Sequence, residues 1–162
     1  MPLLQTSKAL ILVGDIDNDI GSGLLAAAYS DTPPTLILIN SGGGDASLAH
    51  ALACELCEIP NLHTRVAGWC ASAALSILLA GTRRSATWGS DFLTHQLTAE
   101  MDAVSPPSLA AYAALFQENE AVWAQYTALR TGHEDAEWWA NWFKEERWFG
   151  DVRARELGIL TE

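Results

Sequence analysis

The sequence predicts an α/β fold in which a mostly parallel sheet is covered by helices and a long helix follows. Short apolar runs rich in branched residues alternate with segments whose apolar residues recur at helical spacing. Glycine-rich stretches separate several of these segments. After His95 the alternation gives way to one long pattern with apolar residues at three-, four- and seven-residue steps, which is typical of a single extended helix.

Strands and helices are expected to alternate in the first half of the chain. The expected elements are a strand at 8–13, a helix carrying Ile16, Ile20, Leu24 and Ala28, a strand at 35–39, a helix at about 45–58, a strand at 63–67, a helix at 72–80 and a strand at 92–95. The segments Gly14-Asp15 and 40–44 are expected to connect strands to helices.

The second half is predicted to be mostly helical. Ser105-Pro106-Pro107 marks the start of the long helix, and Thr131-Gly132 marks its end. A short helix carrying Trp138, Trp139, Trp142 and Phe143 follows, and residues 152–157 form the last element before Gly158. The sequence has no internal repeat and no long linker, so we expect one domain over 1–162.

Composition excludes several classes of protein. The formal charge of −11, from 9 Lys plus Arg and 20 Asp plus Glu, disfavours binding to a phosphate backbone, so we expect no nucleic-acid partner. The longest apolar stretches are far shorter than the roughly 20 residues that a membrane helix needs, and we expect no membrane partner. The three cysteines are an odd number, which favours a reducing, cytoplasmic setting over a disulfide framework.

Two local patterns have alternative interpretations. Cys54 and Cys57 have the C-x-x-C spacing of redox and zinc sites, but a second ligand pair is missing, and two small buried helix residues are the preferred interpretation. Four of the seven tryptophans lie between positions 138 and 148. They could form a ligand platform, but packing is the commoner reason for such a cluster.

Two segments contain residues suited to chemistry. The glycines at 42–44 leave backbone N–H groups free to face an anion, although this segment lacks the residues of a dinucleotide or phosphate-binding loop. Ser72 follows the third predicted strand and precedes an apolar helix. It could cap that helix, or it could be a nucleophile whose oxyanion is stabilised by the amide of Ala73.

These segments resemble motifs of the proteolytic subunit of the Clp protease. The resemblance rests on Asn40-Ser41-Gly42-Gly43-Gly44, Gly68-Trp69-Cys70-Ala71-Ser72-Ala73-Ala74, Phe92-Leu93-Thr94-His95-Gln96-Leu97, and the stretch from Glu145 to Leu160. It covers nearly the whole chain from about Leu4. It implies the fold shared by Clp peptidases and crotonases, with a head at about 1–95 and 146–162 and a handle at about 96–145.

The resemblance implies a serine endopeptidase that uses neither a cofactor nor a metal ion. Ser72 is the implied nucleophile, His95 the general base and Glu146 the acid, while Gly43 and Ala73 match the oxyanion-hole positions. Glu146 stands where the family usually has Asp, and Gly42 and Leu97 stand where it usually has prolines.

Two other carboxylates compete for the role of the acid, and three other histidines are left out of the site. Glu145 and Asp151 compete with Glu146 as the acid and are expected to be exposed. His50, His63 and His133 match no motif position, and we expect them to be structural or exposed.

The resemblance also implies peptide or unfolded-protein substrates and a ring-forming homo-oligomer. Only about seven residues precede the first predicted strand, which leaves open whether a ring-shaped AAA+ ATPase is a partner and favours ATP-independent cleavage of small peptides. Two alternatives remain at this point: a catalytically silent subunit of the same fold, and an acyl-CoA enzyme of the crotonase fold.

Overall fold

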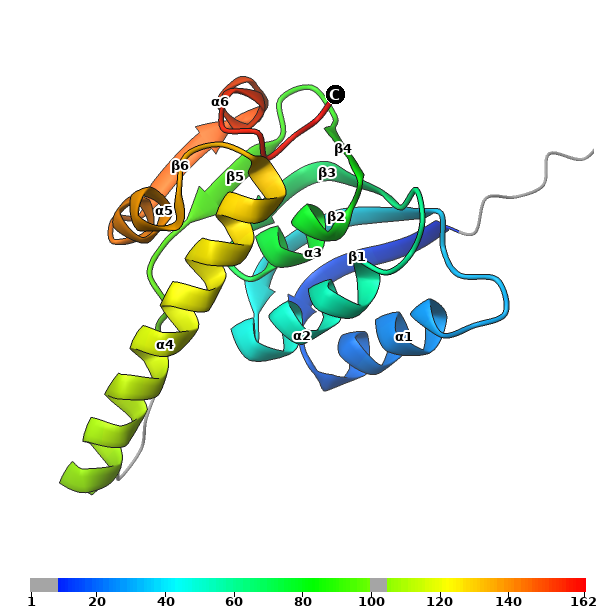
Figure 1. Cartoon of the computed structure of the whole chain (residues 1–162). Helices are drawn as coiled ribbons and strands as arrows, with labels where there is room; N and C mark the ends of the chain where they lie inside the picture. Colours follow the sequence, from blue (N-terminus) through cyan, green and yellow to red (C-terminus); the bar gives the residue numbers. More distant parts are fainter. Residues whose placement is uncertain (1–8, 100–104) are drawn as a thin grey trace, which may run out of the picture.

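The computed structural model describes residues 9–99 and 105–162, and its elements follow the predicted order of strands and helices (Figure 1). They are β1 Ala9–Ile16, α1 Asn18–Ala28, β2 Leu36–Gly44, α2 Ala46–Leu56, β3 His63–Ala71, α3 Ala74–Ala80, β4 Arg83–Ala86, β5 Asp91–Thr94, α4 Pro106–Thr131, α5 Ala136–Phe143, β6 Arg147–Gly150 and α6 Asp151–Glu156.

The strands form one sheet in the order β1-β2-β3-β5-β6, with β4 paired to β3. All pairings are parallel except that of β5 with β6, so the prediction of a mostly parallel sheet is confirmed. Strand β3 divides its pairing: residues 63–66 pair with β4, and residues 69–71 pair with β5. The end of β3 and the end of β5 therefore lie side by side, next to the turn that follows β3.

Strands β1, β2 and β3 are longer than predicted. Strand β1 continues through Gly14-Asp15, which was expected to be a connection, to Ile16, which was expected to lie in the following helix. The segment 40–44 was expected to be a loop, but it extends β2, where Gly43 and Gly44 pair with Asp15 and Ile16 of β1. Strand β3 likewise continues past Ala67 to Ala71. Glycine has a low intrinsic preference for strands, and pairing with neighbouring strands overrides that preference here. The short strands β4 and β6 were missed by the sequence analysis.

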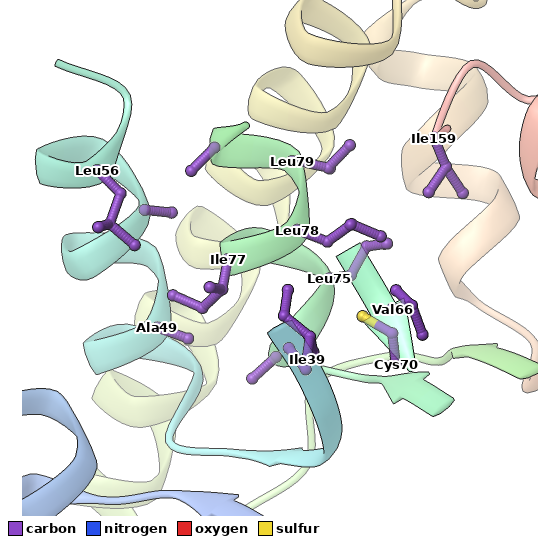
Figure 2. Packing of buried hydrophobic residues seen from close by; sticks show 14 of the residues in the cluster. Ile39, Ala49, Leu56, Val66, Cys70, Leu75, Ile77, Leu78, Leu79 and Ile159 are labelled. Carbon is purple, nitrogen blue, oxygen red and sulfur yellow. The ribbon is translucent and has the colours of Figure 1, made fainter. Parts of the chain in front are cut away.

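Helix α3 lies at the centre of the core, and all seven of its residues are buried. A helix that is apolar on nearly every side must be surrounded by other elements. Figure 2 shows Ile77 on the side of Ala49 and Leu56 of α2, and Leu75 near Val66 and Cys70 of β3. The helix that follows Ser72 is therefore fixed by packing on several sides.

Helix α4 begins at Pro106 and ends before Gly132, whose φ of 64° is the left-handed conformation that glycine favours at a helix end. Both predicted limits are confirmed. Its C-terminal half packs on α3 and α5, whereas its N-terminal half projects away from the sheet (Figure 1). Among the residues that the structure describes, no helix is both long and apolar enough to cross a membrane.

The prediction that the tryptophan cluster is a packing feature is confirmed for Trp138, Trp139 and Trp142, whereas Trp148 is 55% exposed. Trp139 is fully buried, and its ring packs against those of Trp138, Trp142 and Phe143. The interpretation of the C-x-x-C pair was wrong in one respect, because Cys54 is exposed and Cys57 is only half-buried. Their side chains lie 3.8 Å from His50 Nε2 and 3.6 Å from the Tyr126 hydroxyl, respectively.

A buried arginine joins the C-terminal segment to the core. Arg84 is only 5% exposed, and its guanidinium donates to the carbonyls of Gly81, Arg130, Gly158 and Ile159 at 2.8–3.0 Å. Burial lowers the pKa of Arg84, and the four carbonyl acceptors compensate for the lost hydration of its charge. The chain that follows α6 is thereby held against the end of α4.

Candidate active site

Ser72 occupies a strained turn between β3 and α3. Its φ of 54° lies in the left-handed region, which residues with a side chain seldom adopt. Its N–H donates to the Leu93 carbonyl of β5 at 2.9 Å, and this bond holds the turn against the sheet. The residue that caps α3 is Ala73, so the interpretation of Ser72 as a helix cap was wrong. A serine on a sharp strand-to-helix turn is the arrangement of a nucleophile elbow.

Gly43 approaches this turn so closely that no side chain fits between them. A Cβ placed on Gly43 would lie 2.8 Å from Ser72 Cβ, 2.9 Å from the Ala71 carbonyl oxygen and 3.0 Å from the Ala73 nitrogen. Gly43 also has a φ of 103°, which favours glycine by itself. The glycine-rich segment is therefore required by the geometry of the turn.

The two residues expected to form an oxyanion hole differ in their hydrogen bonding. The Ala73 N–H has no backbone acceptor within the described ranges. The Gly43 N–H donates to Ser41 Oγ at 3.1 Å, and that hydroxyl donates in turn to the Gly14 carbonyl at 2.6 Å. The sequence analysis did not predict that Ser41 links Gly43 to Gly14, because this link depends on the contact between β2 and the end of β1.

His95 follows β5 and lies on the same cavity as Ser72. The cavity has a volume of about 350 Å³ and is walled by the start of α2, the segment after His95 and one side of α4. Trp142 Nε1–H donates to the hydroxyl of Thr94 at 2.9 Å, which fixes the end of β5 against α5. The structure thus brings the predicted nucleophile and the predicted base to one cavity.

The hydrogen bonding of His95 selects one tautomer of the neutral ring. Its Nδ1 lies 2.5 Å from the Gln96 carbonyl oxygen, which can only accept, so Nδ1 carries the proton. Nε2 is then the basic nitrogen, as a general base requires. A carbonyl occupies the position for which a carboxylate was expected.

Glu146 lies immediately before β6 and is exposed. Its Oε1 accepts a hydrogen bond from Trp148 Nε1 at 3.1 Å, and the Trp148 ring stacks on that of Trp69. In the part of the chain that the structure describes, no hydrogen bond or ion pair joins Glu146 to His95.

The two competing carboxylates are both engaged with arginines. Glu145 forms an ion pair with Arg147 at 2.6 Å, and Asp151 forms one with Arg155 at 2.6 Å. The expectation that Asp151 is exposed was wrong, because only 8% of it is accessible. The hydrogen bond from Arg155 lowers the pKa of Asp151. Asp151 thus has a structural role at the start of α6.

Cys70 lies two residues before Ser72 and is fully buried. Burial raises the pKa of its thiol, which keeps the sulfur protonated and unreactive. Over residues 9–99 and 105–162, no three or more His, Cys, Asp or Glu side chains are grouped as ligands for a metal ion. The Ser72 hydroxyl and the His95 imidazole are the predicted site groups that line the cavity.

Comparison with known families agrees with this geometry. The family model described as Clp protease matches residues 4–162, which is nearly the whole chain. The chain belongs to the Clp protease family. No curated protein matches the sequence. Family membership confirms the resemblance found in the motifs, and it supports a Clp-type peptidase in general.

The contact between Gly43 and Ser72 leads to a stability prediction for this Clp protease family member. Gly43→Ala should lower the free energy of unfolding by about 3 kcal/mol or more, because the new methyl group meets backbone atoms and φ is unfavourable. Gly89→Ala is the matched control: Gly89 has a φ of 77° but open space around its Cα, so its cost should be about 1 kcal/mol. Urea denaturation of both variants measures the difference, and equal losses would contradict the steric argument.

Proposed function

We propose that the protein is a serine endopeptidase in which Ser72 is the nucleophile and His95 is the general base. The observation that carries the proposal is the strained turn that presents Ser72 to the same cavity as His95. Strained backbone at a functional group persists only where the surrounding structure enforces it. Here the Gly43 contact and the bond to Leu93 enforce it.

The reaction follows from the positions of these groups. Ser72 Oγ attacks the peptide carbonyl carbon while His95 Nε2 accepts the hydroxyl proton. The tetrahedral intermediate then collapses as His95 returns the proton to the leaving amine, which breaks the C–N bond and leaves an acyl ester on Ser72. Water, deprotonated by His95, hydrolyses that ester and regenerates the serine hydroxyl.

The oxyanion of the intermediate would be stabilised by the N–H groups of Ala73 and Gly43. Among the described residues, the Ala73 amide has no competing backbone acceptor. The Gly43 amide has a rather long bond to a neutral hydroxyl, and an anionic oxygen is a stronger acceptor than a hydroxyl. Ser41 would keep its own bond to the Gly14 carbonyl when Gly43 changes partner.

Glu146 is the proposed acid, supported by the register of the last two strands. Strands β5 and β6 are antiparallel, and Thr94 pairs with Arg147. Extending this register by one residue places His95 opposite Glu146. Side chains directly opposite each other on the same face of a sheet are close enough to interact. Glu146 also differs from Glu145 and Asp151 in having no ion pair among the described residues. To reach His95 Nδ1, its carboxylate would leave Trp148 and replace the Gln96 carbonyl.

We further propose that the active form is a ring-shaped homo-oligomer that encloses the site. The N-terminal half of α4 exposes Leu109, Tyr112 and Leu115, and β1 exposes Ile11 and Val13. Such apolar surface is typical of protein contacts. Whether an ATPase also docks depends partly on residues 1–8, which lie outside the described residues.

The first test is covalent labelling. A fluorophosphonate probe should modify Ser72, located by mass mapping, because only an activated serine attacks the phosphorus. Ser72→Ala should lose labelling and lower kcat for peptide hydrolysis on the order of 10⁶-fold while the protein remains folded. Ser22→Ala is the control, since Ser22 is an exposed serine on α1 and is not among the residues that line the cavity of Ser72 and His95. A wild-type protein that is folded but unlabelled would identify a catalytically silent subunit.

The role of Glu146 has its own test. Glu146→Gln should lower kcat by up to about 10⁴-fold, because an amide cannot stabilise the imidazolium that forms during proton transfer. Glu145→Gln, at an exposed neighbour, should change kcat less than about tenfold. Steady-state kinetics with a short fluorogenic peptide provides both values. An unchanged kcat for Glu146→Gln would leave the Gln96 carbonyl as the group that orients His95.

Light scattering tests the assembly. The purified protein at micromolar concentration should have a mass several times that of the 17.5 kDa chain, because its exposed apolar surfaces need partners. Leu115→Glu on α4 should reduce that mass, whereas Glu118→Ala, an exposed change on the same helix, should not. A monomer at all concentrations would contradict the ring.

A further inference from the structure

Asp45 brings a carboxylate to the cavity that holds Ser72 and His95. It precedes α2 as the N-cap residue and is exposed, and it is among the residues that line this cavity. Among the described residues of the cavity wall, Asp45 is the acidic one, and no Lys or Arg is present to balance its charge. The cavity in which a peptide bond would be attacked therefore has a negative charge in its wall.

Two hydrogen bonds fix the position of Asp45. Its N–H donates to the Ile16 carbonyl at 3.0 Å, and its Oδ1 accepts from the Leu48 N–H at 2.9 Å. Within residues 9–99 and 105–162, Asp45 forms no ion pair, and its second carboxylate oxygen has no hydrogen-bond partner. A fixed backbone thus presents an oxygen that a bound ligand can use.

Three further carboxylates add to the negative potential beside Asp45. Asp15 lies on β1, next to the end of β2. Asp17 and Asp19 lie at the start of α1, directly after the Ile16 carbonyl that accepts the bond described above. All three are exposed, and in the described part of the chain none of them is paired with Lys or Arg. Charges of one sign beside a cleft raise the local concentration of ligands of the opposite sign.

The groups that line the cavity distinguish possible occupants. An acidic side chain would be repelled by Asp45, and an aliphatic side chain would leave the carboxylate without a partner. Lysine and arginine carry a cation on an apolar stem, and such a stem can pack on apolar surface while its charged end stays polar. Leu115 and Phe116 of α4 provide the apolar surface, and Ser47 and Asn119 provide further oxygen acceptors. A long cationic side chain therefore matches the cavity best.

We propose that Asp45 is a specificity-determining residue that selects substrates with lysine or arginine close to the cleaved bond. The charged nitrogen donates to the free carboxylate oxygen, while the stem lies against α4. A cavity of about 350 Å³ holds only a short stretch of peptide, so the cationic residue is within a few positions of the bond that Ser72 attacks. The proposal rests on the proposed peptidase function and adds a substrate class to it.

Matched peptides test this selectivity. Digestion of a defined mixture of synthetic peptides, with the products identified by mass spectrometry, locates the preferred position of lysine or arginine. The best substrate is then compared with the same peptide carrying glutamine at that position, which is long and polar but uncharged. Wild-type kcat/KM should favour the cation by about tenfold or more, because an ion pair partly shielded from water is stronger than one in bulk solvent. The ratio should fall when salt is raised to about 0.5 M.

Asp45→Asn isolates the charge. Asparagine caps a helix as well as aspartate does, so the bond to Leu48 is kept while the charge is lost. The ratio should fall to within about threefold, whereas a general loss of structure would slow both peptides equally. Asp135→Asn is the matched control, because Asp135 caps α5 in the same way. It follows the end of α4, roughly 18 Å along the helix axis from the last cavity residue of α4, and should leave the ratio unchanged.

The outcomes separate this proposal from the proposed function. A wild type that cleaves the glutamine peptide as well as the cationic one, or an Asp45→Asn variant that keeps the full ratio, would overturn the selectivity and leave the peptidase intact. If turnover is too slow to measure, the rates at which peptidyl phosphonates with the same two residues label Ser72 give the ratio instead. A folded wild type that cleaves no peptide and is not labelled at Ser72 would overturn both.

Discussion

The close approach of the Gly43 backbone to the turn at Ser72 sets the geometry on which the rest of the site depends. Any side chain at position 43 would meet Ser72, Ala71 or Ala73, so the glycine and the strained serine require each other. The approach is possible because the register of β2 shifts where it pairs with β1 and with β3. Such irregularities turn the strand ends away from regular pairing and are frequent beside active sites.

The division of β3 between two partners explains why Ser72 and His95 meet. The first half of β3 pairs with β4, and its second half pairs with β5, so the turn after β3 lies beside the end of β5. The carboxyl ends of β2, β3 and β5 then supply Gly44, Ser72 and His95 to the wall of one cavity. Ligand sites of parallel sheets commonly form at the carboxyl ends of their strands. The antiparallel strand β6 begins beside the end of β5, so Glu145 and Glu146, which precede it, lie near the same edge.

The elements around the end of β3 differ in how closely they are packed. Helix α3, directly after Ser72, is wholly buried among aliphatic side chains, which gives Ser72 a rigid support (Figure 2). Beside it, residues of α2 and α4, among them His50 and Trp123, line a cavity of about 150 Å³. Close packing under Ser72 and open space beside it thus lie on neighbouring elements.

The sequence by itself determined the α/β order, the limits of α4 and the motifs that contain Ser72 and His95. Helical periodicity depends on residues a few positions apart, and the motifs are contiguous, so both can be recognised locally. Only the tertiary structure decided that segment 40–44 is strand, that β4 and β6 exist, and that Asp151 is buried. It also decided that His95 Nδ1 bonds to the Gln96 carbonyl, and that His50 and Trp123, which are 73 positions apart, line one cavity. Contacts between residues far apart in sequence leave no local pattern, because they are created only when the strands pair and the helices pack.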